Sequence, residues 1–99
     1  MDFMKMMQQA KKMQEQVQKE VREIREEASS GGGAVTVTLD GNKRMTAVKI
    51  SPEAMQGGDV EMLEDLVLTA TNEAARKVDE AVSSRVAGLT GGLNIPGMF

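Results

Sequence analysis

Cysteine, histidine, tryptophan and tyrosine are absent from this sequence, and its two aromatic residues are Phe3 and Phe99. Histidine, cysteine and tyrosine provide most catalytic nucleophiles, acids and bases, and zinc sites need cysteine or histidine. Without cysteine there is also no disulfide framework, which is typical of proteins in a reducing cytoplasm. The composition therefore predicts a protein that is not an enzyme, with no metal, no other cofactor and no small-molecule substrate.

Long apolar runs are missing as well. No stretch approaches the roughly 18 consecutive apolar residues of a membrane-spanning helix, and the N-terminal segment lacks the continuous apolar core of a signal peptide. We therefore expect a soluble, cytoplasmic protein without a membrane partner. Its 99 residues suffice for one domain with an aliphatic, methionine-rich core.

Positive charge is scarce overall but unevenly distributed. The net charge is −3, which argues against a nucleic-acid partner, because nucleic-acid-binding domains are usually basic. Residues 1–25, however, hold six cations against four anions, whereas residues 51–80 hold two cations against eight anions. The first segment is therefore locally positive in an acidic chain.

Proline and glycine do not occur between Met1 and Ala28, and apolar residues recur there every three or four positions. This spacing predicts one amphipathic helix over residues 1–29. A helix of this length runs roughly 40 Å, whereas a compact domain of this size has a radius of gyration of about 13 Å. Part of the helix must therefore project from the domain or contact a partner.

The centre of the chain has the pattern of a small antiparallel sheet. Glycines 31–33 end the first helix, and apolar residues alternate with threonine in residues 34–40. A turn at residues 40–42 then leads to a second strand with Val48 and Ile50 facing inward. Residues 33–51 are therefore expected to form a hairpin, which is marginally stable unless another element covers it.

A second long helix is expected over residues 59–87. Asp59 suits its N-cap, the acidic residues that follow suit the positive end of the helix dipole, and Gly88 suits its end. Residues 51–53 have the pattern of a short helical turn before it. We expect residues 88–99 to form a partly flexible tail broken by glycine and proline.

The cations of the first helix fall into two rows. Lys5, Lys12 and Lys19 are seven residues apart and share one helical face, and Lys11, Arg22 and Arg25 form the second row. Such rows can meet successive phosphates of a nucleic acid, although they can equally serve to solvate the helix. Charge alone favours solvation.

Other chemical motifs are weak. Adjacent carboxylates such as Glu64 and Asp65 diverge by about 100° on a helix, so they do not form a metal or acid–base site. The glycine run at residues 31–33 follows a helix and lacks the Lys-Ser/Thr of a phosphate loop. Neither motif predicts a site.

Four segments together resemble the YbaB/EbfC family of bacterial nucleoid-associated proteins. They are the first helix rich in Met, Gln and Lys, the hairpin entry GGGAVTVTLDGNKR, the stretch VEMLEDLVLTATNEAARKVDE and the closing GLTGGLNIPGMF. The resemblance implies an α+β fold of a long helix, a small antiparallel sheet and a second long helix. It also implies an intertwined homodimer with projecting helices. The family has three strands, and the third is expected within residues 43–51 or after them.

The resemblance further implies DNA binding with low sequence specificity, and roles in nucleoid organisation and gene regulation. The expected location is the cytoplasm, in association with the bacterial nucleoid. The cations expected to contact DNA are Lys5, Lys11, Lys12, Lys19, Arg22, Arg25, Lys43, Arg44 and Lys49. The residues expected at the dimer interface are Val17, Val21, Ile24, Val35, Val37 and Leu39.

One alternative is a protein-interaction or holdase module that resembles prefoldin subunits and does not bind DNA. A hairpin between two long helices, the methionine-rich start and the acidic net charge favour this alternative. It predicts that the two long helices pair with each other as one antiparallel coiled coil.

Overall fold

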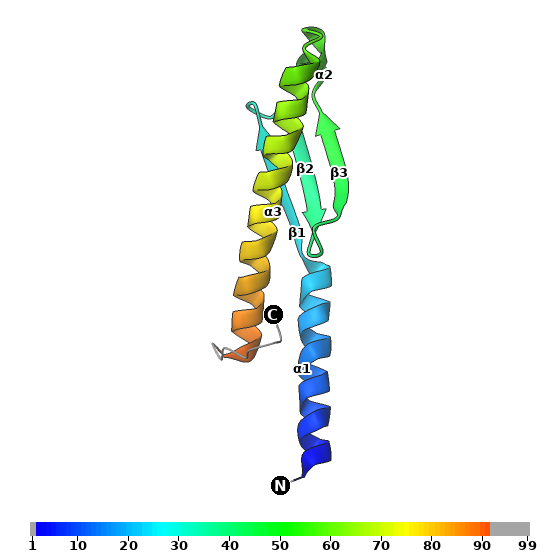
Figure 1. Cartoon of the computed structure of the whole chain (residues 1–99), viewed down its shortest axis with the longest axis vertical. Coiled ribbons are helices and arrows are strands. Elements are labelled where there is room, and N and C mark those ends of the chain that lie inside the picture. The colour runs from blue at the N-terminus through cyan, green and yellow to red at the C-terminus, as the bar shows by residue number, and fades with distance from the viewer. Residues whose placement is uncertain (1, 92–99) are drawn as a thin grey trace.

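The computed structural model describes residues 2–91 of the chain as an elongated α+β domain of 68 × 19 × 17 Å. Its radius of gyration, 18.6 Å, exceeds the roughly 13 Å of a compact domain of this size. Figure 1 shows the cause, because the first helix extends away from the sheet while the last helix runs along it. The prediction that part of the first helix projects is therefore confirmed.

The elements follow one another in a simple order. They are α1 (Phe3–Glu23), β1 (Arg25–Ser30), β2 (Val35–Asp40), β3 (Met45–Ile50), α2 (Pro52–Gln56) and α3 (Val60–Thr90). The three strands form one antiparallel sheet in the order β1-β2-β3. The described residues thus contain the expected α+β layout with a third strand.

The third strand is not where the sequence analysis placed it. It lies before the hairpin, in residues 25–30, which were predicted to be the end of the first helix. The helix ends at Glu23, and Ile24 is its C-cap with an extended backbone. Pairing of this segment with β2 over its full length satisfies the backbone groups that face β2 and overrides the helical propensity of its Arg, Glu and Ala residues.

The boundaries of the second long helix also differ from the prediction. Asp59 is its N-cap, as expected, and accepts a hydrogen bond from the main-chain N–H of Met62. At the other end the helix continues through Gly88 to Thr90, and Gly91 ends it with a φ of 63°. A left-handed cap of this kind favours glycine. The remainder of the predicted tail, residues 92–99, lies outside the described residues.

The core lies between α3 and one face of the sheet. Ala70, Ala74 and Val78 of α3 are fully buried against Val35 and Val37 of β2. The alanines allow the helix axis to approach the sheet closely, and burial of each valine contributes roughly 1.5–3 kcal/mol. Ser30 of β1 adds a polar contact, because its Oγ donates to the main-chain carbonyl of Leu66. One helix and one sheet thus form a two-layer domain.

The helix layer is narrower than the sheet. The contacts of α3 with the sheet are mainly with β1 and β2, and Figure 1 shows β3 beside the helix. Val48 and Ile50 of β3 pair with Val37 and Val35, so they lie on the same face of the sheet as the core. Their predicted orientation agrees with this pairing, but they remain 48% and 41% exposed. No element of the described chain covers them.

Candidate nucleic-acid interface

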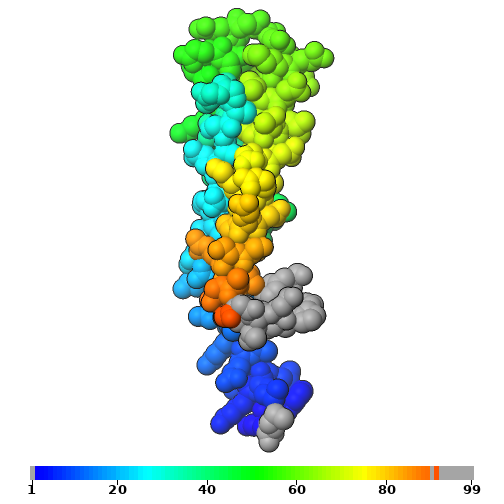
Figure 2. All heavy atoms as spheres, turned by 90° about the vertical axis from the view of Figure 1, so that its left-hand side faces the viewer, coloured from blue at the N-terminus to red at the C-terminus, as the bar shows by residue number. Residues whose placement is uncertain are grey.

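The first half of α1 stands clear of the rest of the domain. Residues 2–12 are all exposed, and Figure 2 shows this arm extending beyond the end of α3. The side chain of Asp2 caps the helix by accepting from the main-chain N–H of Met4, at 3.1 Å. Met13, Val17 and Val21 are half-buried. The arm is therefore held at one end and open to solvent at the other.

Five of the predicted DNA-contacting cations lie on α1 with their side chains exposed. None of them forms an ion pair with another residue in the range 2–91. Their charges are therefore available to an anionic ligand. They are Lys5, Lys11, Lys12, Lys19 and Arg22.

Arg25, which was predicted to belong to the first helix, is the first residue of β1. Its Nη1 donates to the main-chain carbonyls of Arg22, at 3.0 Å, and Ile24, at 2.7 Å. Carbonyls at the end of a helix have no partner within the helix, and a cation there opposes the negative end of the helix dipole. Arg25 therefore stabilises the junction between α1 and β1.

The three predicted cations of the hairpin have different surroundings. Lys43 Nζ forms an ion pair with Asp79 of α3, at 2.8 Å. Arg44 and Lys49 are exposed and form no ion pair within the described part of the chain. Lys49 pairs with Thr36, so it lies on the open face of the sheet, opposite the core. The hairpin thus adds two available charges to those of α1.

Asp40 organises the turn that carries these cations. Its Oδ1 accepts from the main-chain N–H groups of Asn42 and Arg44, both at 2.9 Å. The hydrogen bond from Arg44 is the main cause of the lowered pKa of the Asp40 carboxyl, and nearby Arg25 and Arg44 charges lower it further. The turn is therefore stabilised by an ionised carboxylate.

We predict that Asp40→Asn lowers stability at pH 7 and that this effect shrinks as the pH falls towards 2. Because the pKa of Asp40 is lower in the folded state than in the unfolded state, its charge stabilises the fold above about pH 4. This contribution is lost as the pH falls through the folded-state pKa. Asparagine retains the acceptor oxygen, so the comparison isolates the charge. Urea unfolding midpoints of both proteins from pH 7 to pH 2 test this, and a constant difference would contradict it.

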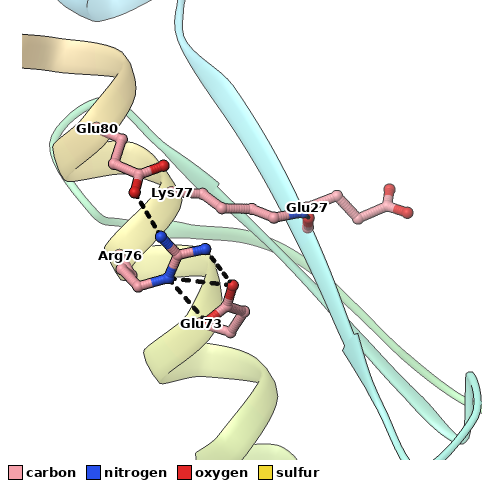
Figure 3. Close-up of polar contacts among 5 residues, drawn as sticks. All are labelled: Glu27, Glu73, Arg76, Lys77 and Glu80. Atoms are coloured by element: carbon pink, nitrogen blue, oxygen red, sulfur yellow. Dashed lines mark hydrogen bonds and ion pairs between the residues drawn. The ribbon is translucent and has the colours of Figure 1, made fainter. Parts of the chain in front are cut away.

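The cations of α3 are used within the domain. Arg76 lies between two acidic residues of its own helix, donating to Glu73 at 2.6–3.2 Å and to Glu80 at 2.5 Å (Figure 3). These contacts lower the pKa of Glu73 and raise that of Arg76. Lys77 reaches across to β1 and donates to the main-chain carbonyl of Glu27, at 2.8 Å (Figure 3).

The last cation of α3, Arg85, pairs with Glu20 of α1 at 2.8 Å. All three cations of the helix are thus engaged, while many of its carboxylates are exposed. The acidic outer face of α3 would repel a polyanion. The positive charge that can meet phosphate is therefore concentrated on α1 and the hairpin.

Four of the predicted dimer-interface residues lie in the interior of the single chain. Their exposed fractions are only 0–2%. The alternation of apolar residues correctly predicted a buried face, but α3 of the same chain covers most of it. The four residues are Ile24, Val35, Val37 and Leu39. The other two, Val17 and Val21, are half-buried on α1.

A different apolar surface is open, and the sequence analysis did not identify it. We call it the apolar flank; it consists of the exposed β3 residues Val48 and Ile50 and the α3 residues Val60, Val67 and Leu68. The α3 residues line a shallow groove together with Leu63, Glu64 and Thr71. The inward orientation predicted for Val48 and Ile50 is the sequence feature that could have indicated this surface. The sequence does not, however, reveal how far α3 extends over the sheet.

Residues 2–91 show neither a metal site nor a membrane-spanning helix. No cluster of three or more acidic residues in this range could hold a metal ion. Likewise, no helix within it has the length and apolar character needed to cross a membrane. The exposed cations and the apolar flank are the two candidate contact surfaces of the described residues.

Comparison with known proteins gives one consistent result. Residues 1–93 match the model of the YbaB/EbfC DNA-binding family. A nucleoid-associated protein of Acetivibrio thermocellus is 53% identical over 95 residues, covering 92% of this chain and 84% of the relative. Another, from Koribacter versatilis, is 47% identical over 92 residues, covering 93% of this chain and 91% of the relative.

Among solved structures, an uncharacterized protein from Helicobacter pylori has the same fold. Its crystal structure gives a TM-score of 0.74 with 20% sequence identity, covering 91% of this chain and 98% of the other. At this identity the similarity concerns the fold alone. The family match and the two relatives, by contrast, extend over nearly all of the sequence, so this chain belongs to the YbaB/EbfC DNA-binding family.

Proposed function

We propose that this protein binds DNA as a homodimer at the bacterial nucleoid, with the lysines of α1 as the main phosphate contacts. Membership of the family carries the DNA-binding role, and the relatives are named nucleoid-associated proteins. The cations of the hairpin make secondary contacts. Nucleoid organisation and gene regulation are the cellular roles that follow.

The distribution of available charge is the observation that carries this proposal. Five exposed cations without ion pairs occupy the projecting helix, whereas on α3 Arg76 and Arg85 pair with carboxylates and Lys77 donates to a main-chain carbonyl of β1. Each lysine or arginine that reaches a phosphate releases counterions, which makes binding favourable without reading bases. The proposed binding is therefore electrostatic, with low sequence specificity.

The apolar flank supports the homodimer. Val48 and Ile50 lie on the core face of the sheet but remain nearly half exposed, and Leu68 of α3 is 60% exposed. An exposed apolar patch rimmed by polar residues is typical of protein interfaces. A second copy presents the same flank, so a two-fold axis can bring the two patches together. Pairing through the flank leaves α1 of each copy free to contact DNA.

A gel-shift or fluorescence titration over a salt series tests the DNA-binding proposal. If the complex makes about six phosphate contacts, the association constant should fall by roughly three decades between 50 and 200 mM salt. The slope of its logarithm against the logarithm of the salt concentration should be about −5. Affinity that does not change with salt would refute phosphate contacts as the basis of binding.

The holdase alternative predicted that the two long helices pair with each other along their length. Instead, α3 packs mainly on β1 and β2, and α1 meets α3 only towards its own C-terminal end. The exposed methionines of the arm are the feature that still favours this alternative. It would be supported if the protein prevented aggregation of an unfolded client but did not shift DNA at low salt.

A further inference from the structure

The junction between α1 and the sheet is held from three sides by contacts that the family resemblance did not predict. We infer that the β2–β3 turn is a wedge that sets the direction of α1, and that Gly41 is therefore a positioning residue for DNA binding. This inference rests on the proposed function, because it concerns how the lysines of α1 are aimed. Gly41 itself need not contact DNA.

The tightest of these contacts lies between Gly41 and the last turn of α1. A Cβ atom placed on Gly41 would lie 1.9 Å from the main-chain oxygen of Val21 and 2.9 Å from its Cγ1. No such approach is possible for a real side chain, so the backbone of one element would have to move. The positive φ in this turn belongs to Lys43, at 63°, and not to Gly41. Glycine is therefore needed at position 41 for space.

Two ion pairs hold the same junction on the side of α3. Lys43 of the turn pairs with Asp79, and Glu20 of α1 pairs with Arg85, each at 2.8 Å. The turn is thus tied to α3, and so is the final part of α1. Both pairs are partly exposed, so each is individually weak, but together they restrain two elements against one rigid helix.

The third restraint is the chain segment that connects α1 to β1. Ile24 is 1% exposed, and its N–H donates to the carbonyl of Val21 at 3.2 Å. Arg25 donates to the carbonyls of Arg22 and Ile24. A buried side chain and satisfied helix-end carbonyls leave the junction little freedom to bend. The junction therefore fixes the direction of the exposed half of α1.

The direction of α1 affects DNA binding through leverage. Gln8 precedes Val21 by 13 residues, or roughly 20 Å of helix. A tilt of about 15° at the junction would therefore move the lysines near Gln8 by roughly 5 Å. This displacement is comparable to the spacing of successive phosphates, so it can remove contacts while leaving every charge in place.

The test combines a distance measurement with DNA titration. Because the chain has no cysteine, spin labels can be placed at Gln8→Cys on α1 and Asn72→Cys on the exposed face of α3. Dilution with unlabelled protein confines the measured distances to one chain. In Gly41→Ala the mean distance should shift, and DNA affinity at 100 mM salt should fall about tenfold, which is about one lost phosphate contact. Gly57→Ala should change neither, because no atom lies within 4 Å of a Cβ there.

A second variant serves if Gly41→Ala does not fold. Glu20→Gln with Asp79→Asn removes both ion pairs and two negative charges. By charge alone this variant should bind DNA more tightly, whereas the wedge model predicts a broader distance distribution and weaker binding. The matched control is Glu15→Gln with Asp65→Asn, which changes the charge equally on exposed residues outside the junction.

Two results would overturn the inference. One is an unchanged distance distribution in both Gly41→Ala and the double variant. The other is a changed distribution with DNA affinity equal to that of the matched control. Because the distances are measured without DNA, they report on the junction even if the wild-type protein fails to bind DNA, a result that would refute the proposed function instead.

Discussion

Replacement of four lysines of α1 by glutamine should weaken DNA binding by roughly 4,000-fold at 100 mM salt. Each phosphate contact raises the association constant about eightfold at 100 mM salt relative to 1 M salt. The factors for four contacts multiply, which gives about 4,000-fold. The slope of log affinity against log salt should also become less negative by about 3.6. The four replaced residues are Lys5, Lys11, Lys12 and Lys19.

The control for this variant makes the same change in net charge on another helix. Four uncharged, exposed residues on α3 are changed to glutamate, which lowers the net charge by four units, as the lysine variant does. If α1 contacts the phosphates, the control should keep most of its affinity and its salt slope. Equal losses in both variants would show that net charge, and not α1, controls binding. The four control positions are Thr69, Asn72, Ser83 and Ser84.

Val48→Asp should convert a homodimer into a folded monomer. The substitution would place a charge in the apolar flank, which a second copy would cover in the proposed dimer, and disruption of a buried interface residue costs about 2–4 kcal/mol or more. The dissociation constant of the dimer should therefore rise by roughly 30- to 1,000-fold. Sedimentation equilibrium over a micromolar concentration series measures this change, and circular dichroism verifies the fold.

The neighbouring residue Ala47 provides a matched control. Ala47 is exposed on the same strand but pairs with Thr38, so it lies on the opposite face of the sheet. Ala47→Asp should leave the dimer intact, although it introduces the same charge into the same strand. If both variants dissociate equally, or if neither does, the flank is not the interface. The monomer should also bind DNA more weakly, because two arms on one particle act with a high effective concentration.

The sequence predicted the order of elements well because their patterns are local. The alternation in β2, the Asp40-Gly41-Asn42 turn and the N-cap at Asp59 each depend on a few neighbouring residues, and the structure contains all three. The segment REEASS is different, since its residues favour a helix and its apolar spacing continues that of α1. Its strand conformation depends on pairing with β2, a contact with residues distant in sequence.

The candidate site was predictable in part for the same reason. Exposure of the α1 lysines follows from the helical spacing of the apolar stripe, and these lysines are exposed in the structure. The pairing of Lys43 with Asp79 depends on where α3 lies. The hydrogen bonds from Arg25 to the helix-end carbonyls depend on the end of α1 at Glu23, earlier than the sequence predicted. Likewise, a buried strand face can be recognised in Val35 and Val37, but the identity of the covering element cannot.

The hydrogen bond from Lys77 to Glu27 bears on how far this protein can assemble. A three-stranded sheet has two outer strands, and an outer strand with free backbone groups can recruit further strands without limit. Here the ammonium group of Lys77 occupies one backbone carbonyl of β1, whereas β3 carries the exposed Lys49 and has a register shift opposite Thr38 and Leu39. A lysine and a bulge on an outer strand both discourage the addition of a further strand. Growth into a fibre by strand addition is thus opposed at both edges of the sheet.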